Sequence, residues 1–508
     1  MTTRTFSKIQ PAHWLGVIIL LVMTGAFIKL AFAIAAFTPQ NQPTGYMGQE
    51  VVTNGTLTSG TETLFRSEYE KEFWSGNLYA YPISAGGIVD TAGEKWSGGA
   101  AVHLQTQNFS TGRFIGTMKD DGTKVPFLSA SLSAVQQGTL AATINATSYT
   151  STQITNFLRG DHSNESATTL RQRLTPLGAS TTPTVLGDIV HSKPFYLADA
   201  TNPTIFVGAN DGMLHAINSA DGTERWAYVP SMLVSKMKAL AANPYTHDYY
   251  VDGQIAVGNA TTSGTRILVG ALGAGGKGLF ALNIDGSAGL TASTDQQAAD
   301  KVLWEITPTK VNYATPQNYD GTANATAYSN LGYTYSAPQL KTINIGTVAA
   351  PIALRVVIIG NGYNNGGDYQ SYLYIINAAD GKLVKAIKAD STATNTTGTA
   401  VTDGTAASPN GLFNTVAFDS NSDGYVDRVY AGDLNGTMWK FDLSSATANL
   451  ASATASVLQV TSPAQPITAT PAAIPHPSGT GYIINFATGG IFTGTQPLTG
   501  TGATGDLS

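Results

Sequence analysis

The nine residues DSNSDGYVD, numbers 419–427, place several oxygen-bearing groups at alternating positions. Calcium is bound by oxygen ligands, and short calcium loops supply them from the first, third and fifth side chains and from the seventh backbone carbonyl. Gly424 stands at the sixth position, where such a loop must bend sharply. The sequence therefore predicts a Ca²⁺ site whose ligands are Asp419, Asn421, Asp423, the carbonyl of Tyr425 and Asp427.

This loop differs from a complete EF-hand. An EF-hand ends in a bidentate Glu at its twelfth position, which here is Tyr430, and the last acid comes early, at Asp427. The flanking segments NTVAF and RVYAG have the composition of strands. We expect a compact calcium loop between two strands. A plain polar turn is the alternative, because Asp and Asn are common in turns, but three neighbouring carboxylates repel one another unless a cation or water screens them.

A loose internal repeat indicates the elements that carry this loop. Each unit has a strand, a turn rich in Gly and Asn, a second strand, an Asp-Gly or Ser turn, and often a third strand with Trp. Such units occupy residues 74–98, 204–229, 266–286 with 301–306, 354–388 and 427–443. One such sheet cannot bury both faces, whereas several arranged radially can. The sequence predicts an all-β fold, a β-propeller, and a β-sandwich with similar hairpins is the alternative.

The composition agrees with a turn-rich β protein. The 508 residues include 54 Gly, and only 12% are charged. No segment after residue 40 shows sustained helical periodicity, and residues 231–243 are the nearest candidate for a short helix. Ser-, Thr- and Asn-rich segments at 100–180, 287–300, 389–410 and 444–471 are expected to form loops or linkers. The sequence has no Cys, which excludes disulfides, thiolate metal sites and Cys nucleophiles.

The first 33 residues have the pattern of a signal peptide. Arg4 and Lys8 precede a long apolar run, and Ala31 and Ala33 form a cleavage-type site. An uncleaved membrane anchor is the alternative, because the run is long enough to span a bilayer. Cleavage removes three cations and no acids, so the formal charge changes from −6 to 24 − 33 = −9. A chain this acidic is not expected to bind nucleic acid, and after cleavage no stable membrane association is expected.

Several motifs resemble the C-terminal propeller of the PilY/PilC family. They are LGDIVHSKPFYL (186–197), FVGANDGMLHAINSADGTERWAYVPSML (206–233), IIGNGYNNGG (358–367) and DSNSDGYVDRVYAGDLNGTMWKFDL (419–443). FWSGNLYAY and FLRGD resemble the segment that precedes that propeller, and the similarity covers roughly residues 65–445. The expected organisation is therefore a signal segment at 1–33, a β-rich flanking region at 34–175 that contributes a blade or lies beside one, and a propeller at 176–508.

The resemblance implies a type IV pilus biogenesis factor and tip-associated adhesin. In that family a calcium loop modulates pilus extension against retraction, and its ligand positions correspond to the five residues named above. The implied consequences are effects on twitching motility and surface adhesion. The implied partners are minor pilins, the pilus machinery and a surface or host receptor. The implied location is outside the cell, at the surface, the pilus tip or the outer membrane. The DxSxS metal motif of some members has no counterpart in this sequence.

A quinoprotein-like dehydrogenase is the main rival, because NDGMLHAINSADGTERW also resembles the blades of those enzymes. Such enzymes hold pyrroloquinoline quinone and calcium in the central channel, often beside a vicinal disulfide. The absence of Cys excludes that disulfide, and the calcium loop here is a local sequence rather than a site assembled at a channel. The blades are therefore expected to be quinoprotein-like in fold, and the chain is not expected to be an enzyme.

Other candidate motifs have structural explanations that we prefer. His191 and His215 have no partner at metal-site spacing, and GALGAGGKG, residues 270–278, lacks the pattern of a phosphate-binding loop and is expected to be a blade turn. The tripeptide Arg159-Gly160-Asp161 is an integrin-type motif but occurs often by chance. Five tryptophans recur at comparable blade positions and are expected to pack between blades rather than to bind carbohydrate: Trp74, Trp96, Trp226, Trp304 and Trp439.

The signal segment leads to a direct prediction about the mature chain. Export with cleavage after Ala33 should give a protein whose N-terminal sequence begins near Ile34. N-terminal sequencing of protein recovered from outside the cytoplasm measures this. A chain that keeps Met1 and fractionates with the membrane would show that the segment is an anchor instead.

Overall fold

The structure is a computed structural model of the chain. It describes residues 46–53, 62–177, 180–262, 264–395, 398–444, 450–462, 464–478 and 481–489. The predicted signal segment at 1–33 lies outside the described residues. Residues 47–508 cluster as one compact unit.

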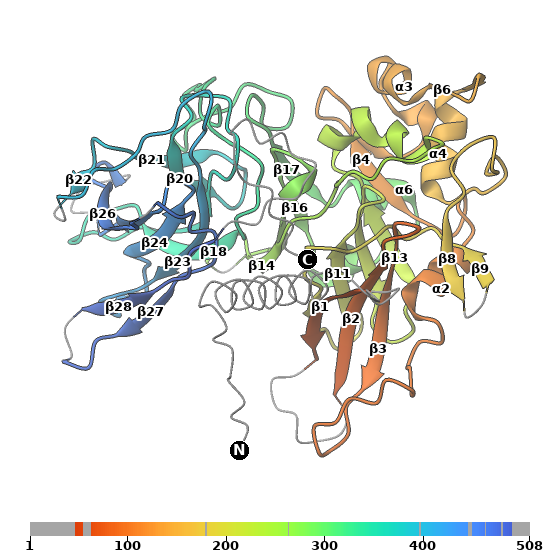
Figure 1. Cartoon of the computed structure of the whole chain (residues 1–508), viewed down its shortest axis with the longest axis horizontal. Coiled ribbons are helices and arrows are strands. Elements are labelled where there is room, and N and C mark those ends of the chain that lie inside the picture. Colours follow the sequence, from red (N-terminus) through yellow and green to blue (C-terminus); the bar gives the residue numbers. More distant parts are fainter. Residues whose placement is uncertain are drawn as a thin grey trace, which may run out of the picture. The chain divides into compact units, whose positions relative to one another are not determined.

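Four antiparallel sheets of similar design follow one another along the chain (Figure 1). The first contains β10 (Phe195–Leu197), β11 (Thr204–Gly208), β12 (Leu214–Asn218) and β13 (Glu224–Tyr228). The second contains β14 (Ile255–Asn259), β15 (Arg266–Ala271), β16 (Leu279–Asn283) and β17 (Val302–Ile306). The third contains β18 (Gln339–Asn344), β19 (Ala353–Gly360), β20 (Ser371–Asn377) and β21 (Leu383–Ala389). The fourth contains β23 (Leu412–Phe418), β24 (Arg428–Asp433), β25 (Thr437–Asp442) and β26 (Thr454–Val460), with β22 (Thr394–Asn395) beside β26.

Smaller sheets stand before and after these four. A three-stranded sheet contains β1 (Tyr46–Val52), β2 (Thr63–Glu70) and β3 (Ser75–Pro82). A hairpin of β27 (Ala472–Pro475) and β28 (Tyr482–Asn485) comes last among the described residues. Two further hairpins pair β6 (Ala142–Ile144) with β7 (Thr147–Tyr149), and β8 (Leu174–Leu177) with β9 (Ser180–Pro183). Four of the repeat units expected from the sequence each contribute two or three strands to one sheet, whereas the unit at 74–98 contributes only β3 among the described residues.

The four main sheets share an irregularity in their last strand pair. In each of them the register between the third and fourth strands shifts by a β-bulge or a similar irregularity. Bulges increase the local right-handed twist of a strand pair. Twisted sheets of this kind can pack face to face around a central axis, as in a propeller. The shifts occur at Ala216/Ile217, Ala281/Leu282, Ile375/Ile376 and Met438/Trp439.

The apolar cores lie between consecutive sheets. Successive side chains of a strand point to opposite faces, and on β11 this sends Ile205 and Val207 into a core shared with β2 and β3, while Phe206 enters a core shared with the second sheet. On β15, Leu268 joins that second core and Val269 joins the next one, shared with the third sheet. Further cores join the third sheet to the fourth and the fourth to β27–β28. This face-to-face succession of sheets is that of a β-propeller, as the sequence predicted.

Two tryptophans fix the contact between consecutive sheets through the turns of the next sheet. The Trp96 indole N–H donates to the carbonyl of Ser219 at 3.3 Å, and that of Trp304 donates to Ala378 at 2.9 Å. Both carbonyls belong to Asn-x-x-Asp-Gly turns, at 218–222 and 377–381, and the Gly of each turn lies under the indole with positive φ. A side chain at either Gly would meet the indole, so these two turns need Gly for packing as well as for conformation.

The other three tryptophans have different roles. Trp226 is buried and donates to the carbonyl of Leu290 at 3.2 Å, so it also joins the first sheet to the second. Trp439 donates to the carboxylate of Asp433 in its own hairpin, at 2.7 Å. Trp74 lies in the turn between β2 and β3 and stacks on His247 with ring centroids 3.5 Å apart. The expectation of packing between blades therefore holds for Trp96, Trp226 and Trp304, and for Trp439, which is buried in the core between the third and fourth sheets, whereas Trp74 makes a different contact.

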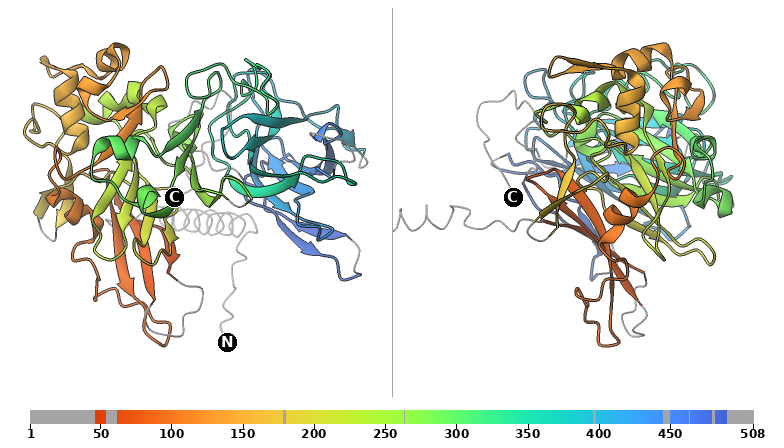
Figure 2. Two further views of the ribbon diagram at one scale, coloured as in Figure 1. Left: turned by 180° about the vertical axis from the view of Figure 1, so that it is seen from behind. Right: turned by 90° about the vertical axis from the view of Figure 1, so that its right-hand side faces the viewer.

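Helices occupy part of the chain where the sequence suggested loops. Figures 1 and 2 show α3 and α4 gathered beside β4 within the compact unit. Both begin with capping boxes, Ser133 with Gln136 and Thr150 with Gln153, a local signal in the sequence that hydrophobic periodicity does not detect. Residues 231–241 form a 3₁₀ helix, η2, close to the range expected for a helix. The helices in the described ranges are α2 (Gly99–Thr106), η1 (Ser129–Ser131), α3 (Ala134–Leu140), α4 (Ser151–Arg159), η2 (Ser231–Ala241), η3 (Gly273–Gly275), α5 (Gly286–Leu290) and α6 (Asp295–Ala299).

The region before residue 175 also extends the first main sheet. β4 (Ile115–Met118) pairs in parallel with β13, and β5 (Lys124–Pro126) pairs with β4. Helix α6 packs on β4 and β5, and one apolar core contains residues of both regions. Strands β4 and β5 therefore lie before the boundary expected at 175/176 but belong to a sheet that lies after it. They complete the outer edge of that blade.

The contact between Gly381 and Trp304 gives a stability prediction. Gly381 has φ +72°, and a Cβ there would lie 3.1 Å from the indole, whereas Gly321 has φ +86° with nothing within 4 Å of such a Cβ. Both substitutions to Ala carry the strain of positive φ. Gly381→Ala should lower the free energy of unfolding by roughly 1–3 kcal/mol more than Gly321→Ala, because it also overpacks the interface between sheets. Chemical denaturation of the two variants measures the difference, and equal losses would show that packing against Trp304 contributes nothing.

Candidate metal centre

The DSNSDGYVD loop closes the first hairpin of the fourth sheet. Phe418 at the end of β23 pairs with Arg428 at the start of β24, so residues 419–427 form the entire connection. The expected position between two strands is therefore correct. The Val426 N–H donates to the carbonyl of Thr342 on β18 at 2.8 Å, and the Tyr482 hydroxyl on β28 donates to the carbonyl of Ser420 at 3.3 Å. The loop is thus attached to the sheet before its own and to the hairpin after it.

The Asp419 carboxylate organises the backbone of the loop. One oxygen accepts the N–H groups of Asn421, Ser422 and Asp423 at 2.6–3.2 Å, and the other accepts that of Gly424 at 2.7 Å. Gly424 has φ +90° and Ser422 φ +64°, so the chain turns sharply around this carboxylate. Partial desolvation raises the pKa of Asp419, but these backbone donors outweigh it and hold the pKa below its ordinary value. The carboxylate is therefore kept ionised.

The other expected ligands divide into two groups. Asn421 lies next to Asp423, since its side-chain N–H donates to the Asp423 carboxylate at 3.0 Å, and Asp423 accepts the Tyr425 N–H at 2.9 Å. Asp427 is buried and turned toward Ser420, whose N–H and hydroxyl each donate to it at 2.9 Å. Among the described residues no three His, Asp or Glu side chains are arranged as a metal cluster. The three acids are therefore spread along the loop, and their oxygens accept hydrogen bonds from other groups of the same loop.

The chemistry of this loop suits a hard cation. It offers three carboxylates, one side-chain amide oxygen and backbone carbonyls within nine residues. The neighbouring cation, Arg428, donates to the backbone carbonyl of Asp427 and to the carboxylate of Asp442 at 2.5 Å, rather than to a carboxylate of the loop. The residues present fit Ca²⁺, and the sequence missed the contacts of Ser420, Val426 and Tyr482 because they join segments far apart in the chain.

The two histidines singled out from the sequence form ion pairs within the chain. His191 Nδ1 lies 2.6 Å from the carboxylate of Asp252. His215 is fully buried between Asp211, at 3.1 Å, and Glu224, at 2.7 Å. Arg113 binds the same Glu224 carboxylate in a bidentate manner, at 2.7 and 2.9 Å. These contacts agree with structural roles for both histidines.

The RGD tripeptide is not available as a surface ligand. Arg159 is fully buried, donates to the carboxylate of Asp295 at 3.0 Å, and donates to the backbone carbonyls of Phe109 and Arg113. Its role is to join α4 to α6 and to the segment before β4. The segment GALGAGGKG connects β15 to β16 and is a blade turn, as expected.

The sheets, the cores between them and a cation-type loop in a blade hairpin define a β-propeller with a candidate metal centre. The family model described as the PilY1 beta-propeller domain matches residues 184–504, and the chain belongs to this family. A relative from Pseudomonas aeruginosa, described as type IV pilus biogenesis factor PilY1, is 30% identical over 87% of this chain and 38% of its own length.

Two solved structures are also similar. The crystal structure of the Pseudomonas aeruginosa PilY1 C-terminal domain is 31% identical, with a TM-score of 0.40 over 57% of this chain and 53% of that chain. A europium-containing methanol dehydrogenase is 12% identical, with a TM-score of 0.34 over 82% of this chain and 62% of that one. The chain spans about two fifths of the length of the curated relative, 38%. No helix in the described ranges is long and apolar enough to cross a membrane.

The buried His215 pair predicts how stability depends on pH. Burial lowers the pKa of His215, but Asp211 and Glu224 outweigh it and raise the pKa to about 9. Burial raises the pKa of Glu224, but Arg113 and His215 lower it to about 2. The stabilisation from His215 is therefore complete below about pH 6.5 and is lost as the pH rises through about 9. The stabilisation from Glu224 is complete above about pH 4.5 and is lost as the pH falls toward 2.

His215→Gln should lower the free energy of unfolding by up to about 3 kcal/mol at pH 6, because it removes the buried cation between Asp211 and Glu224, while Glu224 keeps its ion pair with Arg113. The loss should be smaller at pH 9.5, where the wild-type histidine is largely neutral. Denaturation at both pH values measures this, with the exposed His476→Gln as control. A loss that is equal at the two pH values would mean that His215 is not charged in the folded protein.

Proposed function

We propose that this chain is an exported component of the type IV pilus assembly machinery that binds Ca²⁺ in the loop 419–427. The observation that carries the proposal is the family match over residues 184–504, which includes the loop. The curated relative is described as a type IV pilus biogenesis factor. The proposed location is the cell surface or the pilus tip, and the proposed partners are minor pilins and other parts of the pilus machinery.

The proposed ligands of Ca²⁺ are the carboxylates of Asp419, Asp423 and Asp427, the side-chain oxygen of Asn421 and the carbonyl of Tyr425. Ca²⁺ supplies two positive charges that offset the repulsion between three neighbouring carboxylates. Asp419 also keeps the loop curved through its backbone hydrogen bonds. Binding requires that Asn421 exchange its donor contact with Asp423 for an oxygen contact with the ion.

A calcium-dependent change in this loop would reach the neighbouring sheets. Val426 is bonded to Thr342 on the third sheet, and Ser420 is bonded to Tyr482 on the last hairpin. A ligand that orders the loop therefore stabilises contacts across three consecutive elements of the propeller. We propose that this is how calcium modulates pilus extension against retraction, and with them twitching motility and surface adhesion.

We propose no enzymatic activity for the chain. The curated relative is described as a biogenesis factor rather than as an enzyme. The two histidines that the sequence singled out, His191 and His215, are each held by carboxylates of the chain. A quinoprotein-like dehydrogenase is the alternative, and it rests only on the resemblance of the blade sequences to those of such enzymes.

The calcium site gives a prediction for Asp423→Ala. The substitution removes one proposed ligand and one negative charge from an exposed position, and leaves β23 and β24 intact. The affinity for Ca²⁺ should fall by at least about ten-fold, which corresponds to about 1.4 kcal/mol. Saturating Ca²⁺ should also raise the melting temperature of the wild type, because the ion binds the folded loop. Isothermal titration and thermal denaturation of the purified chain measure the two effects.

Asp320→Ala is the matched control. Asp320 is also exposed and accepts from the N–H and hydroxyl of Thr322, but its turn lacks the other acids of the loop. It should leave calcium affinity unchanged. If Asp423→Ala binds Ca²⁺ as tightly as the wild type, the loop is a polar turn and the proposed calcium site is wrong. In cells, the same variant should alter twitching motility while the amount of exported protein stays constant.

A further inference from the structure

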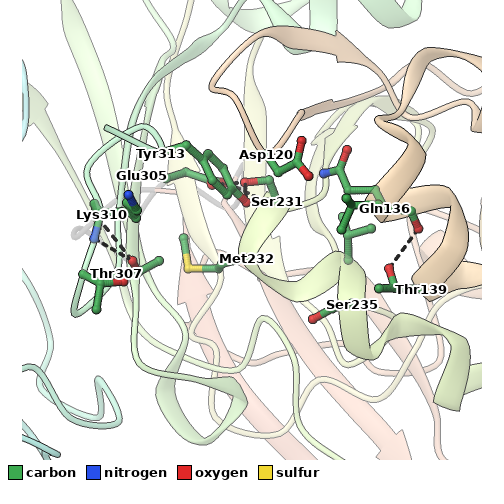
Figure 3. A pocket seen from close by; sticks show the side chains of 13 residues that line it. Asp120, Gln136, Thr139, Ser231, Met232, Ser235, Glu305, Thr307, Lys310 and Tyr313 are labelled. Carbon is green, nitrogen blue, oxygen red and sulfur yellow. Dashed lines mark hydrogen bonds between the residues drawn. The ribbon is translucent and has the colours of Figure 1, made fainter. Parts of the chain in front are cut away.

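A pocket of about 330 Å³ lies between α3, η2 and the segment that follows β17. Its size falls in the range of about 300–1,000 Å³ that is typical of ligand sites. Met232, Val234 and Val135 supply apolar surface, and Glu305, Ser231 and Tyr313 supply polar groups. Figure 3 shows that these three polar side chains lie close together among the lining residues, with Asp120 beside them.

Glu305 is a buried carboxylate with three donors and an unused acceptor position. The Tyr228 hydroxyl and the Ser231 N–H, at 2.7 Å, donate to one oxygen, and the Ser231 hydroxyl donates to the other. An ionised carboxylate has about four acceptor sites, so the second oxygen retains capacity for a further donor. Glu305 is 3% exposed, and it lines an open pocket.

The charge of Glu305 is not neutralised by a side chain in the described part of the protein. Its surroundings supply hydrogen bonds but no cation, and burial raises the pKa of Glu305. Four other buried carboxylates each pair with a basic side chain: Glu224 with Arg113, Asp188 with His247, Asp252 with His191, and Asp390 with Lys388. Buried charges are normally paired in this way, because an unpaired charge is costly in a medium of low dielectric constant.

Asp433 is the useful comparison. It is also buried, and it has only neutral donors on its side chain, from Trp439, Asn410 and Thr437. These donors come from its own hairpin and the preceding segment, so they enclose the carboxyl within the fourth sheet. Glu305 differs because one end of its carboxylate faces a space large enough for a ligand.

The segment after β17 holds the pocket in shape. Asn312 and Tyr313 have φ +48° and +61°, a left-handed conformation that Asn tolerates but that is unfavourable for the bulky Tyr313. Asn312 is fixed by two bonds with the backbone of Glu305, at 2.8 and 2.9 Å. The Tyr313 and Ser231 hydroxyls are 2.7 Å apart. Strained residues held by several bonds are often found at binding sites, where they fix a polar group in advance.

Charge selects the type of ligand. Burial is the main cause that raises the pKa of the Tyr313 phenol, and the charges of Glu305 and Asp120 raise it further, so this part of the pocket is acidic. Lys310, the cation among the lining residues, lies beside Thr307 in Figure 3, on the side of Glu305 away from Asp120. We propose that this pocket binds a primary ammonium group carried on an aliphatic chain, with the ammonium at Glu305, Tyr313 and Asp120 and the chain along Met232 and Val234.

The ammonium group supplies what this site lacks. It has three donors for the free acceptor position of Glu305 and for the Tyr313 oxygen, and its charge offsets that of the carboxylate. The Tyr313 ring adds a cation–π surface. Two sources present this chemistry, a free aliphatic amine and a lysine side chain of another polypeptide. The site is separate from the calcium loop, so neither proposal depends on the other.

The test is titration of the purified full chain with four probes, in the presence and absence of calcium. The probes are n-pentylamine, 1,5-diaminopentane, Nα-acetyl-lysine methylamide and its Nε-acetylated form, which has no charge. At least one of the first three should bind saturably with a dissociation constant of about 1 mM or tighter, and the fourth should not bind. Preference for the lysine amide identifies a polypeptide as the source, and preference for the simple amines identifies a free amine.

Variants assign the binding to this pocket. Glu305→Gln keeps the shape and removes the charge, and should weaken binding at least ten-fold. Asp120→Asn, at an exposed position, should weaken it about two- to five-fold. Asp285→Asn, an exposed acid outside the lining residues, should leave it unchanged. Thermal denaturation shows whether each variant is folded. If Glu305→Gln does not fold, the amine affinity of the double variant Tyr313→Phe with Asp120→Asn is the test instead. Absence of binding by every amine, equal binding of the acetylated form, or unchanged affinity in the folded variants would overturn the proposal.

Discussion

The structure depends on one constraint, namely that its sheets are apolar on both faces. A strand such as β11 sends alternate side chains to opposite sides, and every one of its five residues is buried. A sheet of this kind is stable only when another sheet covers each face. The chain meets this requirement by placing consecutive sheets face to face, and the cores between them contain the largest buried side chains, including Trp96, Trp226 and Trp304. The Asp-Gly turns beneath two of these indoles then determine how closely the sheets approach.

Buried charges join the helical segment to the propeller. Arg113 and Arg159 are both fully buried and lie side by side, since each donates to the backbone carbonyl of the other. Arg113 reaches Glu224 in the first sheet, and Arg159 reaches Asp295 on α6. Asp295 also accepts the N–H of Ile115, at the start of the strand that extends the first sheet. Removing either partner of a buried ion pair destabilises the folded protein. This network therefore fixes the position of the segment 99–170 against the blade.

The two proposed sites share one physical feature. In the loop 419–427 and in the pocket at Glu305, carboxylates are held by hydrogen bonds and are not neutralised by a basic side chain that the structure describes. Four other buried acids, Glu224, Asp188, Asp252 and Asp390, have such partners, whereas Asp433 is enclosed by neutral donors. The loop offers several oxygens at spacing suited to a small hard ion, whereas the pocket offers one buried carboxylate, a phenol and an apolar wall. The difference in donor number and surroundings is the reason that we assign a divalent cation to one and an organic ammonium group to the other.

The sequence by itself determined the repeat of strand, turn and strand, the all-β propeller and the position of the acidic loop between two strands. These features depend on residues close together in the chain: alternating apolar side chains, Asp-Gly turns and the spacing from Asp419 to Asp427. Tertiary structure alone decided that Arg159 is buried, that β4 pairs with β13, and that Val426 and Ser420 attach the loop to neighbouring sheets. The pocket also belongs to this second class, because Asp120, Ser231, Glu305 and Tyr313 come from separate segments. Contacts between distant segments leave no fixed spacing in a single sequence, so packing and buried charge had to be seen in three dimensions.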